Sequence, residues 1–353
     1  MRATPIVLAA AAAAAIAAAG LLAAHGRTRH PALPAVTDLS VLPSPDQALA
    51  VGTSCEPVEL ARVGARVTAL LETASGELWI GTSGAGLVLR APSGEEAAPV
   101  LSGGERFVNA LVEHDGLVWA ATQGGLLAFD GERRVATLLA QDGVTALAQA
   151  RHVLYAGTAR GLHRIQVDGA VPVEATGPAG EPLRVTALAA TGARLWIGTP
   201  SGAYALSLAI VEAPLLQRTA RWHPLVSGAP PAQTNVVTAL AAVGEAVVAG
   251  TDDGGLVRLA EGAAASCARF AEARANEVNP GAAAAVGGAA VFGTQGGGVL
   301  LATPRPGALD VSRPPDLARG EISAVAPGAA GALVGTAAGA VLRLACPGIT
   351  PAA

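Results

Sequence analysis

Few residues in this sequence of 353 residues have the types and spacing that catalysis requires. All 23 basic residues are arginine, so the lysine of a P-loop and the lysine of a Schiff-base enzyme are both missing. There is no Cys-x-x-Cys pair, and no two histidines have the His-x-x-x-His spacing of metal ligands. The histidines are His25, His30, His114, His152, His163 and His223. We therefore predict a protein without a cofactor and without enzymatic activity.

Two short motifs come close to a chemical site. The stretch Gly-Thr-Ser-Gly-Ala at 81–85 resembles a nucleophile elbow, but it lacks the final glycine and falls in an expected hairpin turn. Asp252 and Asp253 could hold calcium, although adjacent carboxylates in such a turn are more often turn residues. We expect neither a catalytic serine nor a metal at these positions.

Both motifs belong to a repeat that runs along the chain. The repeat is marked by a threonine that follows glycine, or alanine in the second copy, and its copies are 36 to 52 residues apart. These threonines are Thr82, Thr122, Thr158, Thr199, Thr251, Thr294 and Thr336. Seven copies of about 40 residues indicate a repeat architecture.

Each copy contains short β-favouring runs separated by glycine-rich turns. In the first copy, strand a is 67–72, strand b is 77–82 and strand c is 86–91; a strand d, such as 134–139 in the second copy, follows. Four antiparallel strands in a unit of this length form one propeller blade. The sequence predicts an all-β fold: a single seven-bladed β-propeller over residues 55–348.

Two columns of residues agree with that fold. A bulky residue lies two positions before the glycine, or before the alanine of the second copy, and should fill the space between neighbouring sheets. This column is Trp79, Trp119, Tyr155, Trp196, Val248, Val291 and Leu333. The third residue of strand a is alanine in every copy, as crowding toward the axis requires; these are Ala69, Ala110, Ala146, Ala187, Ala239, Ala282 and Ala324. We expect the threonine to bond turn backbone and the glycine to allow an unusual φ.

The stretch VTALLETASGELWIGTSGAGLVLR, residues 67–90, resembles the two-component regulator propeller repeat. The resemblance is strongest where Leu-Trp-Ile-Gly-Thr recurs, at 78–82 and 195–199, and it extends over about residues 57–345. In that family such propellers are typically extracytoplasmic sensing halves of membrane histidine kinases, often for carbohydrates. The resemblance implies a sensing propeller, and the chain departs from the family pattern because no kinase part follows the seventh copy.

Propellers usually bind partners on the face formed by the b–c and d–a loops. In this sequence that face should carry a mixed polar set that we take as candidate binding residues: Arg106, Asp142, Arg160, Arg184, Asp252, Asp253, Gln295 and Arg319. The fourth copy has an insertion over residues 208–233 that includes Trp222 and His223. The insertion is either a binding feature or an apolar cap over the sheet edge, and we favour the cap.

The first 26 residues carry an export signal. One arginine precedes an uncharged apolar stretch from Pro5 to Ala24, which is long for a cleaved signal and nearly long enough to span a bilayer. It is either a signal peptide or an N-terminal membrane anchor; a buried alanine-rich helix is the third alternative. Residues 27–54 form a Pro/Ala-rich linker. We place the folded part in the periplasm or cell envelope.

Closure of the ring can also be predicted. The seventh copy ends in CPGITPAA, which is too short for a strand d, whereas the run 57–63 precedes the first strand a without a role. We predict that residues 57–63 pair with strand c of the seventh copy, which brings Cys55 beside Cys346. An oxidising compartment allows a disulfide there and leaves Cys267 outside it, buried in a strand d. Three unpaired core thiols are the alternative.

These features favour a binding protein over an enzyme. The net charge of −4, without a basic cluster, gives no footprint for nucleic acid. We expect a monomeric exported platform that binds a protein or a glycan through its polar loop face. The alternatives are a propeller lyase or hydrolase, which needs a His/acid constellation that we do not find, and a structural subunit of an envelope assembly, which needs an apolar docking patch.

Overall fold

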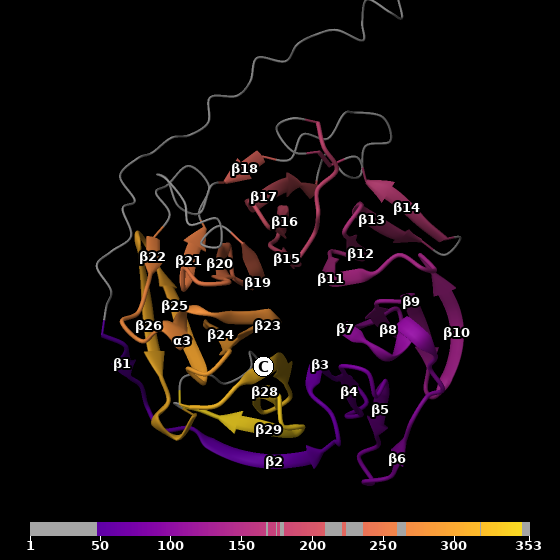
Figure 1. Ribbon diagram of the computed structural model, residues 1–353, viewed down its shortest axis with the longest axis horizontal. Coiled ribbons are helices and arrows are strands. Elements are labelled where there is room, and N and C mark those ends of the chain that lie inside the picture. Colours follow the sequence, from indigo (N-terminus) through magenta and orange to yellow (C-terminus); the bar gives the residue numbers. More distant parts are fainter. Residues whose placement is uncertain are drawn as a thin grey trace, which may run out of the picture. The chain divides into compact units, whose positions relative to one another are not determined.

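The computed structural model describes residues 48–166, 169–173, 175–176, 180–208, 221–223, 236–259, 266–317 and 319–347. Over these residues the chain forms seven antiparallel sheets arranged as blades around a central axis (Figure 1). The predicted seven-bladed β-propeller is therefore confirmed. The predicted signal or anchor segment lies outside the described residues, among which no helix is long and apolar enough to span a membrane.

Blades one to three follow the predicted order of strands a, b, c and d from the axis outward. Blade one is β3 Val67–Glu72, β4 Leu78–Thr82, β5 Leu87–Arg90 and β6 Glu96–Ala97. Blade two is β7 Val108–His114, β8 Leu117–Thr122, β9 Gly125–Asp130 and β10 Arg133–Leu138. Blade three is β11 Val144–Ala150, β12 Val153–Thr158, β13 Gly161–Gln166 and β14 Gly169–Val173.

Blades four to six repeat the pattern. Blade four is β15 Ala187–Ala190, β16 Arg194–Thr199, β17 Gly202–Ser207 and β18 Arg221–His223. Blade five is β19 Val237–Val243, β20 Ala246–Thr251, β21 Leu256–Leu259 and β22 Ser266–Ala268. Blade six is β23 Val278–Val286, β24 Ala289–Thr294, β25 Val299–Arg305 and β26 Ala308–Arg313. The helical elements are short: η1 Gly103–Arg106, α3 Ala273–Asn276 and η2 Pro315–Leu317.

The fourth-copy insertion supplies the outer strand of its own blade. The backbone of β18 pairs antiparallel with β17, with His223 opposite Ala203. The rest of the insertion, from residue 209 to 220 and from 224 to 233, lies outside the described residues. The choice between a cap and a binding feature therefore stays a prediction.

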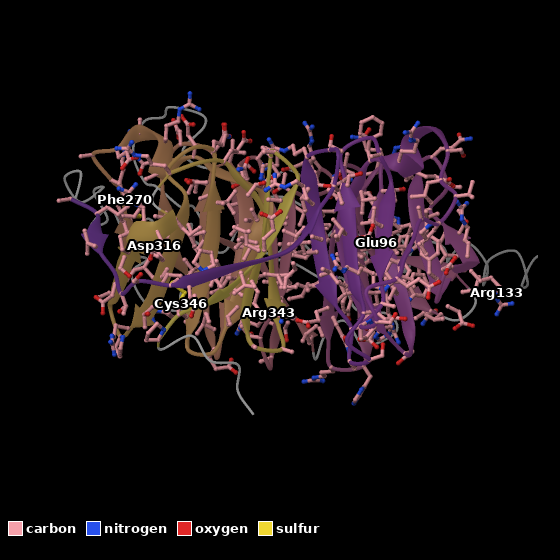
Figure 2. The ribbon with its side chains drawn as sticks, turned by 90° about the horizontal axis from the view of Figure 1, so that it is seen from below. Glu96, Arg133, Phe270, Asp316, Arg343 and Cys346 are labelled. Atoms are coloured by element: carbon pink, nitrogen blue, oxygen red, sulfur yellow. A yellow bond between two sulfur atoms is a disulfide. The ribbon has the colours of Figure 1, made fainter. Side chains whose placement is uncertain are left out.

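Blade seven takes its strands from both ends of the sequence. It consists of β27 Ile322–Gly328, β28 Gly331–Thr336 and β29 Ala340–Ala345, and its outer strand is β2 Glu56–Arg62, as predicted. Glu56 lies opposite Ala345 and Arg62 opposite Ala340. The predicted disulfide joins Cys55 to Cys346 across this junction (Figure 2).

A further strand lies within the segment that we interpreted as a linker. Ala50–Val51 form β1, which pairs in parallel with β26 and makes blade six five-stranded. Gly52 N donates to Arg313 O at 2.8 Å, and the Ser54 hydroxyl bonds to Asp316. The ordered part of the propeller therefore begins before Cys55, and the segment ahead of β2 runs along blade six.

Cys267 lies in β22, the outer strand of blade five, and is outside the disulfide. It is half-buried in an outer strand, where the sequence analysis expected full burial. One edge of β22 pairs with β21, and the other edge is the unpaired outer edge of the sheet, which explains the difference. Burial still raises the pKa of its thiol to about 11.

Side chains fill the space between the sheets as the bulky column predicted. Trp79, Val248, Val291 and Leu333 are each 0% exposed. Trp79 contacts blade two, where its ring centroid lies 5.7 Å from that of Phe129. The column therefore forms the core of the propeller, one layer for each pair of blades.

The threonine of the repeat fixes the b–c turn. Thr82 Oγ1 donates to Gly86 O at 2.8 Å and accepts from Ala85 N at 3.1 Å. The equivalent donor bonds recur in blades two to six, from Thr122, Thr158, Thr199, Thr251 and Thr294. The predicted role of the threonine is confirmed.

The predicted role of the preceding glycine is wrong. The backbone φ angle is not positive at Gly81, Gly198 or Gly250. Each instead faces a valine of the next blade: a Cβ built on Gly81 would lie 2.6 Å from Val108 Cγ1 and 3.1 Å from Ala69 Cβ. Glycine is needed at this position because neighbouring blades approach closely, and blade two accommodates Ala121 there.

Gly81→Ala should therefore lower the free energy of unfolding by about 1–3 kcal/mol, the usual cost of overpacking a core. Urea unfolding of the full chain measures it. Gly64→Ala is the matched control, because a Cβ at Gly64 would meet nothing within 4 Å. Equal stability of the two variants would contradict the packing explanation.

A set of hydrogen bonds links the blades around the axis. The second residue of strand a donates to the carbonyl of the first residue of the next strand a. These bonds are Thr68 to Val108 at 2.5 Å, Asn109 to Val144 at 2.7 Å, Thr145 to Val185 at 2.8 Å, Thr186 to Val237 at 2.6 Å, Asn279 to Ile322 at 2.8 Å and Ser323 to Val67 at 2.6 Å. Between blades five and six, Thr238 donates instead to Gly250 of its own blade at 3.2 Å.

Candidate functional site

The propeller has two loop faces. Because the strands of a blade alternate in direction, the b–c and d–a connections lie on one face, here called the upper face, and the a–b and c–d turns lie on the lower face. Figure 2 shows Phe270, from a d–a connection, higher in the view than Arg133, which follows a c–d turn.

All eight candidate residues lie in upper-face connections. Arg106 ends η1, Asp142 precedes β11, Arg160 is in the β12–β13 turn, Arg184 precedes β15, Asp252 and Asp253 are in the β20–β21 turn, Gln295 is in the β24–β25 turn and Arg319 precedes β27. The side chains of Arg106, Arg160, Arg184 and Arg319 are exposed, whereas Asp142, Asp252, Asp253 and Gln295 are half-buried. The set therefore spreads over six blades.

The structure brings two of the eight into direct contact. Arg160 Nη1 lies 2.9 Å from Asp142 Oδ1, with side-chain exposures of 79% and 26%. His163, on β13, lies near the same carboxylate. Burial lowers the pKa of His163, and the Asp142 carboxylate partly offsets this effect. This ion pair links the connection before blade three to the b–c turn of that blade.

The sequence analysis missed an exposed aromatic ring on the upper face. Phe107 follows Arg106 and is 38% exposed, and its backbone N–H donates to Gly104 O at 3.2 Å. Arg106 and Phe107 together present a cation and an apolar ring at the junction of blades one and two. A phenylalanine between a short helix and a strand gives no repeat-column signal, which is why the alignment of copies did not identify it.

The loop that carries Arg106 is held in place by the outer strand of blade two. Arg134, on β10, donates to both carboxylate oxygens of Glu105 at 2.8 and 2.9 Å and to Val100 O at 3.1 Å. The Arg134 hydrogen bonds lower the pKa of Glu105, and the charged pair holds η1 in place. The sequence analysis did not predict this contact between the outer strand of blade two and the blade-one connection.

A second polar network lies at the closure between blades seven and one. The Arg66 guanidinium bonds to the Glu321 carboxylate, and its Nη2 donates to Asn279 Oδ1 at 3.0 Å. Arg66 precedes β3, Glu321 precedes β27 and Asn279 belongs to β23, so three blades meet at this guanidinium. Among the described residues, no three His, Cys, Asp or Glu side chains are grouped to hold a metal ion.

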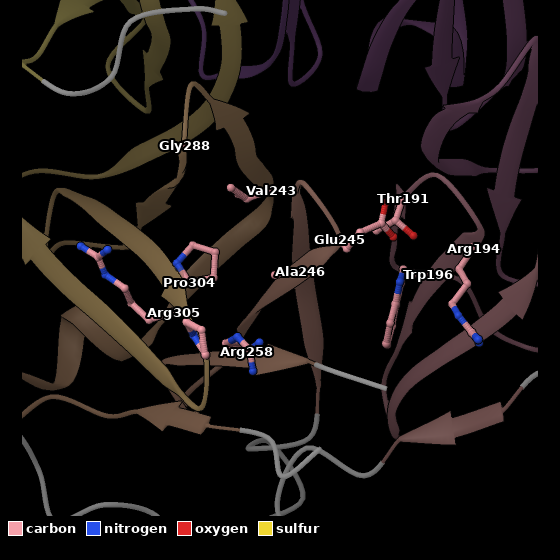
Figure 3. A pocket seen from close by; sticks show the side chains of 11 residues that line it. Thr191, Arg194, Trp196, Val243, Glu245, Ala246, Arg258, Gly288, Pro304 and Arg305 are labelled. Carbon is pink, nitrogen blue, oxygen red and sulfur yellow. The ribbon is translucent and has the colours of Figure 1, made fainter. Parts of the chain in front are cut away.

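A cavity of about 540 Å³ opens on the opposite, lower face (Figure 3). It is bounded by the a–b turns of blades four and five and by the c–d turn of blade six, including Arg194, Glu245 and Arg305. In Figure 3 Arg258 of β21 lies between Pro304 and Arg305 of blade six on one side and Trp196 of blade four on the other. The sequence analysis placed binding on the upper face and did not predict this cavity.

Comparison with known families supports the repeat assignment. Residues 63–84 match the two-component regulator propeller family, which confirms the resemblance at the first copy of the repeat. Comparison with the curated protein sequences gives no match.

Solved structures share the fold at low sequence identity. The extracellular domain assigned to a hybrid two-component system of B. thetaiotaomicron is 16% identical with a TM-score of 0.60, and the alignment covers 83% of this chain and 40% of that one. Virginiamycin B lyase from Staphylococcus aureus is 11% identical with a TM-score of 0.64, covering 84% of this chain and all of that one. The RRP9 WD40 repeats are 13% identical with a TM-score of 0.63, covering 85% and 99%. At these identities the likeness concerns the propeller fold.

Proposed function

We propose that this protein is a non-enzymatic, exported binding or sensing platform that engages a protein or glycan partner through its upper face. The observation that carries the proposal is the arrangement of that face. The exposed Arg160 stands on a b–c turn whose backbone is fixed by Thr158, and the exposed Arg106 stands on a connection that is fixed by the Arg134–Glu105 pair. Fixed loops that present polar side chains favour binding because little conformational entropy is lost.

Export is supported by two independent features. The Cys55–Cys346 disulfide persists in an oxidising compartment, and the N-terminal sequence has the pattern of an export signal. The extracellular two-component domain that shares the fold agrees with a sensing role. We place the propeller in the periplasm or cell envelope, as a monomer that is either free or held by its N-terminal segment.

Three arginines are best placed to contact a partner. Arg106, Arg184 and Arg319 form no ion pair within the described part of the chain, whereas Arg160 is neutralised by Asp142. An unpaired guanidinium offers a planar fork that suits carboxylates and sulfates. Phe107 adds an apolar surface beside Arg106 for the face of a sugar or a side chain.

The test is a comparison of charge reversals on the two faces. We expect Arg106→Glu with Arg184→Glu to weaken binding of a partner isolated from envelope extract by about tenfold or more, because charge-assisted contacts are lost. The measurement is titration of that purified partner, or of a glycan identified on an array, with the full chain.

The control reverses two lower-face arginines, Arg133→Glu with Arg151→Glu, which changes the net charge equally. Arg134 is unsuitable as a control because it holds η1, the helix that ends at Arg106, whereas the Arg133–Asp130 pair is exposed on the lower face. Equal weakening by both pairs would indicate general electrostatics and would contradict the assignment to the upper face. Unchanged affinity in both pairs would contradict it as well.

A further inference from the structure

The lower-face cavity contains a guanidinium whose donors are not all used. Arg258 Nε and Nη1 are buried, and neither has a hydrogen-bond partner. Buried donors of a charged group that remain without acceptors carry a substantial desolvation cost. A carboxylate that enters the cavity beside Arg258 would offset the charge of the guanidinium, so Arg258 is a point at which a ligand can gain binding energy.

The orientation of Arg258 follows from the register of blade five. Arg258 lies opposite Val248, and paired residues on adjacent strands share one face of a sheet. Val248 packs with Phe292 and Leu300 of blade six, so this face of blade five looks toward blade six. Pro304 and Pro306 of blade six accordingly line the cavity with Arg258.

Blade seven shows one way in which an arginine at this position can be neutralised. In blade seven, Arg343 lies opposite the bulky residue Leu333, as Arg258 lies opposite Val248. Arg343 Nη2 donates to Glu72 Oε1 of the next blade at 2.7 Å. A carboxylate from the neighbouring strand a therefore neutralises the arginine there.

Blade six lacks that carboxylate. Glu72 lies opposite Leu78, one residue before Trp79 of the bulky column; in blade six the residue opposite Ala290, one before Val291, is Ala285. A methyl group thus stands where blade one supplies a carboxylate. The junction of blades five and six therefore has the arginine without the counterion that Arg343 has in blade seven.

A second polar group shares this face. Ser266 lies opposite Arg258 in the β21–β22 register, and its Oγ is buried without a hydrogen-bond partner. Two of the other charged groups of the cavity, Glu245 and Arg305, are directed elsewhere. Glu245 Oε1 lies near Gly192 of blade four, 3.1 Å from where a Cβ added to that glycine would stand. Arg305 Nε donates to Asp310 Oδ2 at 2.9 Å.

We propose that the cavity between blades five and six binds a small carboxylate-bearing molecule, with Arg258 taking the carboxylate and Pro304 and Pro306 contacting its apolar part. The ligand carboxylate occupies the place that Glu72 fills beside Arg343. The cavity volume of about 540 Å³ is in the range of small-molecule sites. This site is on the face opposite the proposed partner surface, so it adds to the proposed function and does not depend on it.

The test uses para-fluorophenylacetate as the probe and fluorine NMR of the full oxidised chain. We expect saturable binding with a Kd of about 1 mM or tighter. The alcohol in which a hydroxymethyl group replaces the carboxylate should bind at least about tenfold more weakly, since it lacks the charge-assisted hydrogen bonds. No saturable binding of the acid, or equal binding of acid and alcohol, would overturn the proposal.

Two variants change the site in opposite ways. Arg258→Gln removes the cation, and Ala285→Glu supplies an internal carboxylate; both should weaken binding of the acid by about tenfold or more. Arg164→Gln is the matched control, because Arg164 lies opposite Tyr155 at the same repeat position in blade three. An unchanged Kd in Arg258→Gln, or an equal loss in Arg164→Gln, would overturn the assignment.

Stability provides a readout that does not require the probe. Ala285→Glu should raise the urea midpoint of the natural chain and should fail to raise it when Arg258 is already Gln, because the gain comes from the new ion pair. An equal effect of Ala285→Glu in both backgrounds would show that no carboxylate reaches Arg258 and would overturn the comparison of the repeats. Upper-face charge reversals leave this result unchanged, so the two proposals fail separately.

Discussion

Replacing both Cys55 and Cys346 with serine should lower the free energy of unfolding by about 5 kcal/mol, as the chain-entropy model predicts for a loop of this size. The two cysteines are 291 residues apart, and their side chains are 2% and 5% exposed. The disulfide therefore closes nearly the whole described chain into one loop. Urea unfolding of the oxidised protein and of the double variant measures the difference.

Cys267→Ser is the control for this experiment, because Cys267 lies outside the disulfide and its replacement keeps the closure intact. The wild-type protein in reductant should approach the stability of the double variant. Alkylation of both Cys55 and Cys346 after unfolding without reductant would contradict the assignment, as would a double variant as stable as the wild type.

Trp79→Ala should lower the free energy of unfolding by about 3–5 kcal/mol, the usual cost of removing a core aromatic side chain. Trp79 is 0% exposed and packs against Phe129 of blade two, so the change leaves a cavity between two sheets. Arg106→Ala, on the exposed upper face, should change stability by less than about 0.5 kcal/mol. Equal stabilities would contradict the interior position of the bulky column.

Trp79→Phe separates packing from hydrogen bonding at the same position. The indole Nε1 of Trp79 is buried without a hydrogen-bond partner, so its removal costs no bond. Phenylalanine retains part of the volume and should destabilise less than alanine does. A loss with phenylalanine as large as the loss with alanine would contradict the packing explanation, because both variants lack the indole N–H and only phenylalanine retains a ring.

The repeat made most of the fold predictable from sequence. Positions of Gly-Thr and of the bulky column gave the strands and the number of blades, because each copy must bury the same face against the next. The unassigned run before Arg66 and the short tail after Cys346 were enough to predict ring closure. β1 was not predictable, since two residues in parallel pairing with β26 carry no pattern.

Contacts between blades were the part that single copies could not indicate. The glycine of Gly-Thr looked like a turn residue, and its real constraint is Val108 from the next blade. Thr68 and Asn109 looked like ordinary strand residues, although each donates a hydrogen bond to a backbone carbonyl of the next blade. Such constraints depend on how two units pack, which a pattern within one unit does not report.

The candidate site also has a part that the sequence predicts and a part that depends on how the blades pack. Loop positions on the upper face could be named from the strand order alone, whereas the Arg134–Glu105 pair required the packing of the rim on a connection. The lower-face cavity depends on comparing Ala285 with Glu72 at equivalent register. Copies five to seven keep little of the motif, so the sequence alone did not align these positions.

The shared blade seven also determines the order in which the protein can fold during synthesis. β2 is made first, but its partner β29 belongs to the last copy, so the ring stays open until the whole repeat array has emerged. Cys267 emerges ahead of Cys346, so it is available to Cys55 before the native partner is. A disulfide formed between Cys55 and Cys267 would have to be reshuffled, and we expect the yield of the native protein to depend on the disulfide isomerase capacity of its compartment.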